Sequence, residues 1–263
     1  MEHALLPLAG FLVGIVASIT GVGGGIFIVP LLTMAYGFIP QHAIGTSLGS
    51  IIFTAIAATI AYARQRRIYY RLGLLMACGT VPGAYFGAYL TTVVSSRLLG
   101  LLFGAFLFFM ALRMAVDDLG RSAEGTVDAL SLTSSPAREE VTSFFKVARI
   151  VILGFLAGFG SGFFGIGGGV LAVPAMNFGL HIPIHLATAT SMFMMILTSL
   201  SGAVQHTLAN HLHWGYALLL ALGTIFGAQV GAGLSRKISG TMLRRIFGVI
   251  MLIVSVQMLL KFF

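Results

Sequence analysis

Hydrophobic segments separated by short polar loops fill most of this 263-residue chain. Three long intervals, 3–63, 72–96 and 150–235, contain no Asp, Glu, Lys or Arg. Because a helix needs about 20 apolar residues to cross a bilayer, these intervals predict several membrane helices in series. The hydrophobic blocks run over about 4–36, 41–63, 70–95, 97–116, 147–180, 183–207, 213–235 and 238–262.

The composition also indicates a membrane protein. The chain is 58% hydrophobic and 8% charged, whereas soluble domains carry about 25% charged residues. Its net charge of +8 comes from basic residues in the short loops between hydrophobic blocks, a pattern typical of membrane proteins rather than of nucleic-acid binding. We therefore predict an all-α polytopic membrane protein that lies in a lipid bilayer and has no nucleic-acid partner.

The chain aligns with itself at an offset of 144 residues. The segment GFLVGIVASITGVGGGIFIVP (10–30) matches GFLAGFGSGFFGIGGGVLAVP (154–174) at 10 of 21 positions. Similarly, GTVPGAYFGAYL (79–90) matches GTIFGAQVGAGL (223–234) at 7 of 12 positions. Self-similarity at a fixed offset predicts an internal duplication.

The duplication predicts three parts of the chain. These are a first membrane repeat over 1–116, a polar cytoplasmic linker over 117–145 and a second membrane repeat over 146–263. The linker holds six of the seven acidic residues. Such a composition cannot bury a core, so we expect a loop there.

Glycines interrupt the first hydrophobic block of each half. The block of the first half, at roughly 33 residues, is longer than one crossing needs. TGVGGGIFIVP (20–30) and FGIGGGVLAVP (164–174) place a glycine cluster and a proline inside these blocks. In a helix interior, Gly costs about 1 kcal/mol relative to Ala, and Pro costs about 3. We therefore expect the first block to be broken into helices over 4–20 and 25–36.

The positions of the basic residues favour one topology. If the broken block crosses once, the repeats are parallel and the basic clusters fall on both sides of the membrane. If the block enters and returns as a hairpin, the repeats are inverted. The clusters near 64–71, 146–149 and 236–245 then share one face, as the positive-inside rule requires. We predict two inverted repeats, about 8–10 membrane segments in all, and both termini outside the cytoplasm.

Each glycine break offers main-chain donors for an anion. The backbone N–H groups at the start of a helix have no intrahelical partner, and glycine lets an oxyanion approach them. Two Thr-Ser pairs add hydroxyl donors, and no membrane block contains the carboxylates that a cation would need. The candidate substrate-binding residues are Gly23, Gly24, Gly25, Thr46, Ser47, Gly167, Gly168, Gly169, Thr190, Ser191 and Gln229.

Some of these features also allow a purely structural interpretation. Glycines in membrane helices permit close packing, which is the role expected for Gly83 with Gly87 and for Gly227 with Gly231. Hydroxyls in membrane helices also bond to carbonyls of their own helix. The Thr-Ser pairs fit this interpretation about as well as they fit substrate binding.

The remaining polar positions predict no metal centre. Gln41 and His185 lie near helix starts and suit a cap or an interface. His206, His211 and His213 fall in a polar loop, where we expect them to be solvated. HIPIH carries a proline between its histidines, which argues against a metal site, and we expect no cofactor.

The duplicated glycine motif resembles that of a known family. GVGGGIFIVP and GIGGGVLAVP, followed by AIGTS and ATATS, are similar to the TauE/SafE family of sulfite exporters, also called DUF81 membrane permeases. The resemblance covers nearly the whole chain, although the linker is longer and more polar than the family pattern requires. It implies transport of sulfite, sulfoacetate or related sulfonates across the bacterial inner membrane, typically outward.

We therefore predict a secondary transporter that exports small sulfur-containing anions. An anion channel that uses the same breaks is one alternative, and an uptake permease for a small carboxylate or sulfonate is another. We expect transport to be either passive, down the gradient of the anion, or coupled to protons. Coupling would run through a titrating histidine such as His185 or through the substrate's own proton. No enzyme motif such as HExxH is present. The sequence is compatible with a homodimer.

Overall fold

The computed structural model describes residues 5–121, 144–180, 182–235 and 252–262. The regular elements are α1 (Leu5–Thr20), α2 (Gly25–Ala35), α3 (Pro40–Arg64), α4 (Tyr70–Val93), α5 (Ser96–Arg121), α6 (Phe144–Phe164), α7 (Gly169–Pro174), the π-helix η4 (Ala175–Gly179), α8 (Ile184–Leu208) and α9 (Trp214–Leu234). A further apolar helix covers Leu252–Phe262. The described ranges contain no strand, so the prediction of an all-α protein is confirmed.

Five of the described helices are long and apolar enough to cross a membrane. They are α3, α4, α8, α9 and the part of α6 from Val147 to Phe164. Shorter apolar helices accompany them, including α1 and α2. Large side chains on the outer faces stay exposed, for example Leu8 at 60% and Leu12 at 58%, as expected where lipid replaces water. The chain is thus a polytopic membrane protein.

The predicted break of the first hydrophobic block is confirmed. Expected helices over 4–20 and 25–36 correspond to α1 and α2. In the second half, the equivalent block forms α6 and the short α7, which continues into η4. Helices α5 and α6 both extend into the predicted linker, whose residues 122–143 lie outside the described ranges.

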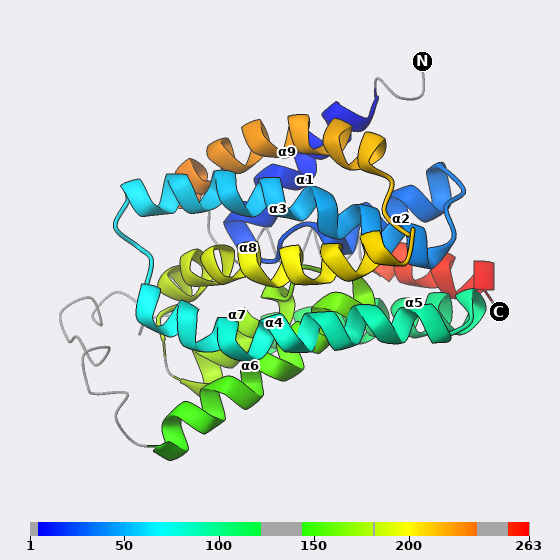
Figure 1. Ribbon diagram of the computed structural model, residues 1–263. Coiled ribbons are helices and arrows are strands. Elements are labelled where there is room, and N and C mark those ends of the chain that lie inside the picture. Colours follow the sequence, from blue (N-terminus) through cyan, green and yellow to red (C-terminus); the bar gives the residue numbers. More distant parts are fainter. Residues whose placement is uncertain (1–4, 122–143, 181, 236–251, 263) are drawn as a thin grey trace.

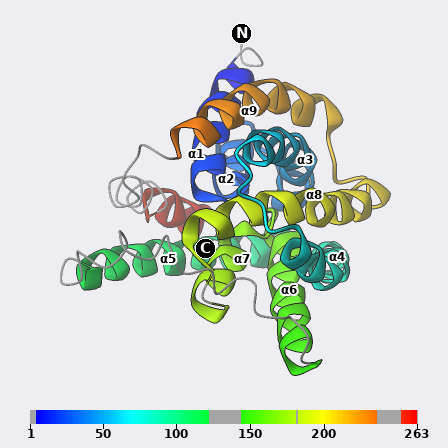
Figure 2. The same cartoon turned by 90° about the vertical axis from the view of Figure 1, so that its left-hand side faces the viewer.

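Helices of the first half pack against helices of the second half. Helix α1 of the first half packs along α9 of the second, and α4 packs along α6. Between these two pairs lie α3 and α8 (Figures 1 and 2). Figure 1 shows that α3 and α8, which occupy equivalent positions in the two halves, run in opposite directions.

Glycines allow the backbones of α4 and α6, and those of α1 and α9, to touch. A methyl group added at Gly83 or Gly87 would overlap a carbonyl oxygen of α6, and one at Gly227 would overlap the Phe11 carbonyl of α1. Gly231 approaches the Ile15 carbonyl in the same way. The packing role predicted for these spaced glycines is therefore confirmed.

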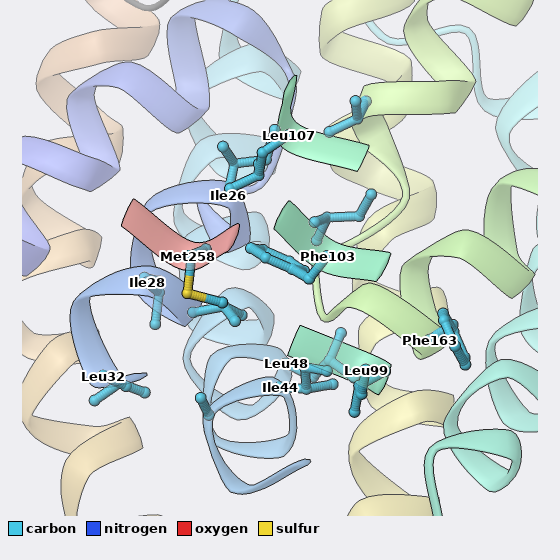
Figure 3. Packing of buried hydrophobic residues seen from close by; sticks show 14 of the residues in the cluster. Ile26, Ile28, Leu32, Ile44, Leu48, Leu99, Phe103, Leu107, Phe163 and Met258 are labelled. Carbon is cyan, nitrogen blue, oxygen red and sulfur yellow. The ribbon is translucent and has the colours of Figure 1, made fainter. Parts of the chain in front are cut away.

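An apolar core fills the space between the first break and the end of the chain. Figure 3 shows Ile26 and Leu32 of α2, Ile44 of α3 and Phe103 of α5 in this cluster, with Met258 of the last helix. All five side chains are buried. This packing fixes α2, and with it the first glycine break, against α3.

Candidate functional site

Both glycine breaks depend on left-handed backbone. Gly23 and Gly24 have φ values of +88°. Gly167 and Gly168 have φ values of +79° and +87°. Gly24 and Gly168 are the N-caps of α2 and α7, and neither helix start has a side-chain cap. Only glycine adopts this conformation at little cost, which explains why the breaks occur at these positions.

The two breaks lie against each other in the middle of the protein. A Cβ atom at Gly25 would overlap the carbonyl oxygen of Gly165, and one at Gly169 would overlap that of Gly21. The two contacts are equivalent, because Gly25 aligns with Gly169 and Gly21 aligns with Gly165 at the offset of 144 residues. The two predicted halves of the site are therefore in direct backbone contact.

The Thr-Ser pairs join each half to the other. Ser47 donates a hydrogen bond to the Gly165 carbonyl at 2.9 Å. The Ser191 hydroxyl lies 2.9 Å from the Gly21 carbonyl and 2.8 Å from the Thr188 carbonyl of its own helix, so these two oxygens share its one proton. Both serine side chains are fully buried and reach a carbonyl oxygen of the facing break. The serines thus have a structural role, and their binding of substrate stays a prediction.

The two threonines differ from the serines in one chemical respect. Thr46 accepts a hydrogen bond from the backbone N–H of His213 at 3.1 Å, and Thr190 accepts one from that of Tyr69 at 3.0 Å. Each threonine acts as acceptor here and keeps its own proton. Thr46 and Thr190 can therefore donate to a ligand, since a hydroxyl both donates and accepts.

Backbone donors remain at the start of each half-helix. In α2 the first described backbone bonds run from Phe27 and Ile28 to the Gly24 carbonyl, at 3.0 and 3.1 Å. The N–H groups of Gly25 and Ile26 come before these first bonds, at the open end of the helix. In α7 the first bonds run from Leu171 and Ala172 to the Gly168 carbonyl, so the N–H groups of Gly169 and Val170 occupy the same positions. All four residues are buried. Such groups form an anion-binding concavity when they converge.

Met195 of α8 lies between the two breaks. Its sulfur contacts Gly23 and would lie 2.7 Å from a Cβ added at Gly167. Its methyl carbon would lie 2.6 Å from a Cβ added at Gly169. The side chain is fully buried. Methionine is flexible and adapts its shape to irregular spaces. The sequence did not suggest this residue, because its equivalent in the first half is the ordinary apolar residue Ile51.

The surroundings of the second break are more polar than those of the first. Ser161 and Thr198 lie beside Gly168, whereas Val13 and Ala17 lie beside Gly24. Thr198 donates to the Met194 carbonyl at 3.0 Å and lies 2.6 Å, oxygen to oxygen, from the Thr80 hydroxyl. The Ser161 hydroxyl is fully buried and has no hydrogen-bond partner among the described residues.

This difference singles out Ser161 as a candidate residue that sequence reasoning missed. A buried hydroxyl without a partner loses its hydration and gains no hydrogen bond in return. Its equivalent in the first half is Ala17. The only available signal was this serine-for-alanine difference between two otherwise matched segments, and the duplication alone gives it no meaning.

Comparison with known proteins assigns the family. The model of the family described as Sulfite exporter TauE/SafE matches residues 6–258. The chain belongs to the TauE/SafE family. It is 35% identical over 267 residues to the probable membrane transporter protein YunE of Bacillus subtilis, and the match covers 98% of each chain.

A second relative gives the same description. A probable membrane transporter protein of Methanocaldococcus jannaschii is 30% identical, over 97% of this chain and 95% of its own. No solved structure matches this TauE/SafE protein. The family consists of membrane transporters, so this chain is a transporter and not an enzyme.

The predicted polar residues away from the breaks make structural bonds in this TauE/SafE transporter. Gln229 donates to the Ala57 carbonyl at 2.8 Å, which joins α9 to α3. Gln41 donates to the Val94 carbonyl at 3.1 Å and accepts from Ser96 at 2.9 Å. Gln41 therefore has the interface role expected of it. Gln229 is bonded away from the glycines, and its contact with substrate stays a prediction.

The expectation of solvated histidines is wrong for His206. Helix α8 extends to Leu208, so His206 belongs to its last turns and is fully buried. His213 is exposed as expected, and His211 is partly buried. Within the described ranges, no group of three or more His, Cys, Asp and Glu side chains is arranged to hold a metal ion.

Proposed function

We propose that this TauE/SafE protein is a secondary transporter that exports small sulfur-containing anions such as sulfite, sulfoacetate or related sulfonates. The observation that carries the proposal is the contact between the two breaks, where N–H groups precede the first backbone bonds of α2 and α7. The TauE/SafE family name supports sulfite as the first substrate to test.

The donor set favours a small anion with several acceptor oxygens. Backbone N–H groups of the glycine breaks and the hydroxyls of Thr46 and Thr190 can donate. No membrane block carries an Asp or Glu side chain that would attract a cation. Because the breaks touch, a bound ion has little room, and sulfite or a sulfonate headgroup suits the space better than a large organic anion.

The second break is the stronger half of the proposed site. The buried Ser161 hydroxyl beside Gly168 has a free proton, and the equivalent alanine of the first break offers none. An oxyanion that accepted this proton would satisfy a group that has no hydrogen-bond partner among the residues described here. Met195 would have to move from between the breaks, which its flexible side chain permits.

The proposed topology is that of inverted repeats in the bacterial inner membrane, with both termini outside the cytoplasm. The opposite directions of α3 and α8 support it, as does the exchange of equivalent contacts between the halves. Transporters of this kind place the substrate site where broken helices meet near the midplane. The basic cluster at 64–71 would then face the cytoplasm.

A panel of anions tests the proposed substrate class. Purified protein in detergent is heated with sulfite, sulfate, sulfoacetate, taurine or acetate, because a ligand that binds the folded state raises its melting temperature. We expect sulfite or sulfoacetate to stabilise the protein, and the zwitterion taurine to have less effect. If none of these anions raised the melting temperature, the proposed substrate class would be wrong.

A carrier and a channel are distinguished by flux. A carrier exchanges internal for external substrate and saturates as substrate concentration rises. A channel gives unitary currents through the same two breaks. The position of Met195 supports the carrier, because its fully buried side chain lies between the two breaks and would have to move before an anion could pass.

A further inference from the structure

Four histidines gather at one end of the protein, where α2 leads into α3 and α8 leads into α9 (Figure 1). His42 lies in α3 and His206 in α8, while His211 and His213 lie in the connection between α8 and α9. They come from both halves of the chain. The proposed substrate site does not use them.

The imidazole rings form a continuous series. Nδ1 of His42 lies 2.8 Å from Nε2 of His213, which is hydrogen-bonding distance. The ring centroids of His42 and His211 are 5.3 Å apart, and those of His211 and His206 are 5.7 Å apart. His213 is exposed and His206 is fully buried. The series therefore leads from the surface into the protein.

Two ring nitrogens of this series lack partners. Nδ1 of His206 and Nδ1 of His211 are both buried, and neither bonds to any described residue. On its other side, Nε2 of His206 lies 3.5 Å from the Gly162 carbonyl oxygen. Gly162 follows Ser161 in the chain, so the inner end of the series lies next to the second glycine break.

Few other titratable groups face these rings. Tyr216 of α9 lies 6.5 Å from the His213 ring, and Tyr36, after α2, lies 5.8 Å from Tyr216. The electrostatic interactions described for His42 and His206 are with other histidines of the series. The cations at the same end bond to carbonyls elsewhere, Lys261 to Thr33 at 2.7 Å and Arg97 to Phe262 at 3.0 Å. No acidic side chain of the described ranges forms an ion pair here.

The chemistry of the cluster points to a proton rather than a metal ion. The ligating atoms of the described His, Cys, Asp and Glu side chains do not converge in groups of three or more. A pair of imidazoles in hydrogen-bonding contact can instead share one added proton. Burial lowers the pKa of the His211 imidazole, so the neutral form predominates there at neutral pH.

We propose that His42, His206, His211 and His213 form a proton-binding site that is coupled to anion binding at the second glycine break. This inference rests on the proposed anion transport. One proton added to the cluster turns an imidazole into an imidazolium, and the N–H···N bond between His42 and His213 becomes an N–H⁺···N bond. The charge attracts an oxyanion near Ser161, so proton and anion favour each other's binding.

The coupling has to be reciprocal. If a bound proton raises the anion affinity by some factor, a bound anion raises the proton affinity by the same factor. Couplings between two sites in one protein lie between about 5- and 150-fold. We therefore expect anion affinity to rise at least about fivefold from about pH 8 to about pH 5.5, and proton uptake when the anion binds.

The test uses methanesulfonate, whose charge does not change over this pH range. Its affinity is measured by calorimetry at both pH values, and proton uptake is measured in weakly buffered solution near pH 6.5. We expect both effects in the natural protein and in His185→Gln, an exposed histidine at the opposite end of α8. His42→Gln should bind the anion at about pH 8 as the natural protein does, and lose both effects.

Two results would overturn the inference while leaving the proposed function intact. One is equal affinity at both pH values in the natural protein, and the other is unchanged pH dependence in His42→Gln. If Zn²⁺ raised the melting temperature of the natural protein but not of His42→Gln, the cluster would be a metal site instead.

A measurement without any anion separates this inference from the proposed function. Nitrogen NMR of protein labelled at histidine follows each imidazole through the pH titration. We expect the signals of His42 and His213, whose rings are in hydrogen-bonding contact, to change together as the proton is added. Independent changes of these two rings would contradict the cluster, whether or not an anion binds.

Discussion

Ser47 of the first half donates a hydrogen bond to the Gly165 carbonyl of the second half at 2.9 Å, at the point where the second membrane block breaks. Ser191 of the second half reaches the Gly21 carbonyl at 2.9 Å and shares its proton with the Thr188 carbonyl of its own helix. The two halves therefore hold each other's broken backbone in place. Non-helical backbone at membrane depth persists only where its polar groups are satisfied, and these serines satisfy a carbonyl oxygen of each break.

Loss of the Ser47 hydroxyl should destabilise the protein. Ser47→Ala leaves the buried Gly165 carbonyl without this donor, which costs roughly 1–3 kcal/mol. Thermal unfolding in detergent should show a lower melting temperature for Ser47→Ala and for Ser191→Ala. The control is Thr92→Val, which removes an exposed hydroxyl bonded within its own helix. Equal melting temperatures for all three variants would mean that the cross-half bonds do not stabilise the breaks.

Valine at a break should abolish anion binding. Gly168→Val places a branched side chain in left-handed backbone and blocks the approach to the N–H groups of Gly169 and Val170. The atoms nearest to a Cβ at Gly168 lie 3.3 Å away or farther, so the Cβ itself overlaps no neighbour and the left-handed backbone is the main cost of the change. We expect the stabilisation by sulfite or sulfoacetate to disappear.

Gly37→Val is the matched control for this change. Gly37 also has a left-handed φ, +68°, and a Cβ there would meet nothing within 4 Å. The control therefore introduces the backbone strain away from the breaks. If Gly168→Val kept the anion-induced shift, the glycines would serve packing only.

The Ser161 hydroxyl should matter for binding and not for folding. It has no hydrogen-bond partner in the part of the chain that the structure describes, so Ser161→Ala should leave the melting temperature unchanged or slightly higher. A hydrogen bond to a charged group contributes about 1.5–3 kcal/mol. Calorimetry should therefore show roughly 10- to 100-fold weaker sulfite binding by Ser161→Ala. Unaltered affinity would place the anion away from the second break.

Stability should fall on the acid side of neutrality because of His211. Its pKa in the folded protein lies below the value of 6.5 expected for a free side chain, because the ring is desolvated by burial. As the pH falls through 6.5, the unfolded chain takes up a proton that the folded chain does not, so the free energy of unfolding decreases.

Replacement of His211 should remove this part of the pH dependence. Melting temperatures of the natural protein and of His211→Asn are compared at about pH 8 and about pH 5. The drop between the two pH values should be smaller for His211→Asn. A drop of the same size would show that His211 titrates alike in the folded and unfolded chains.

The positions of the breaks were predictable from the sequence, whereas the side chain that lies between them was not. Four glycines and a proline inside an uncharged block break a helix by local energetics alone, so the end of α1 and the start of α2 followed from residues 20–30. The position of Met195 depends on how α8 packs against both breaks. That packing joins segments far apart in the chain, and no local pattern of one segment specifies it.

The histidines show the same limit. His206 stands near a polar loop in the sequence, and the end of a hydrophobic block suggested exposure. The structure continues α8 to Leu208 and packs His206 against Gly45 of α3. Close approach of the two helices at this glycine buries the ring, and the sequence around His206 does not reveal its partner.

Counterflow in proteoliposomes tests the central claim most directly. Vesicles containing the purified protein are loaded with unlabelled sulfite and diluted into a trace of radiolabelled sulfite. The natural protein and Gly37→Val should accumulate label transiently, whereas Gly168→Val should match empty vesicles. If the natural protein gave no exchange with sulfite or with a sulfonate, or if Gly168→Val exchanged as fast as Gly37→Val, the claim that the paired glycine breaks carry the anion would be contradicted.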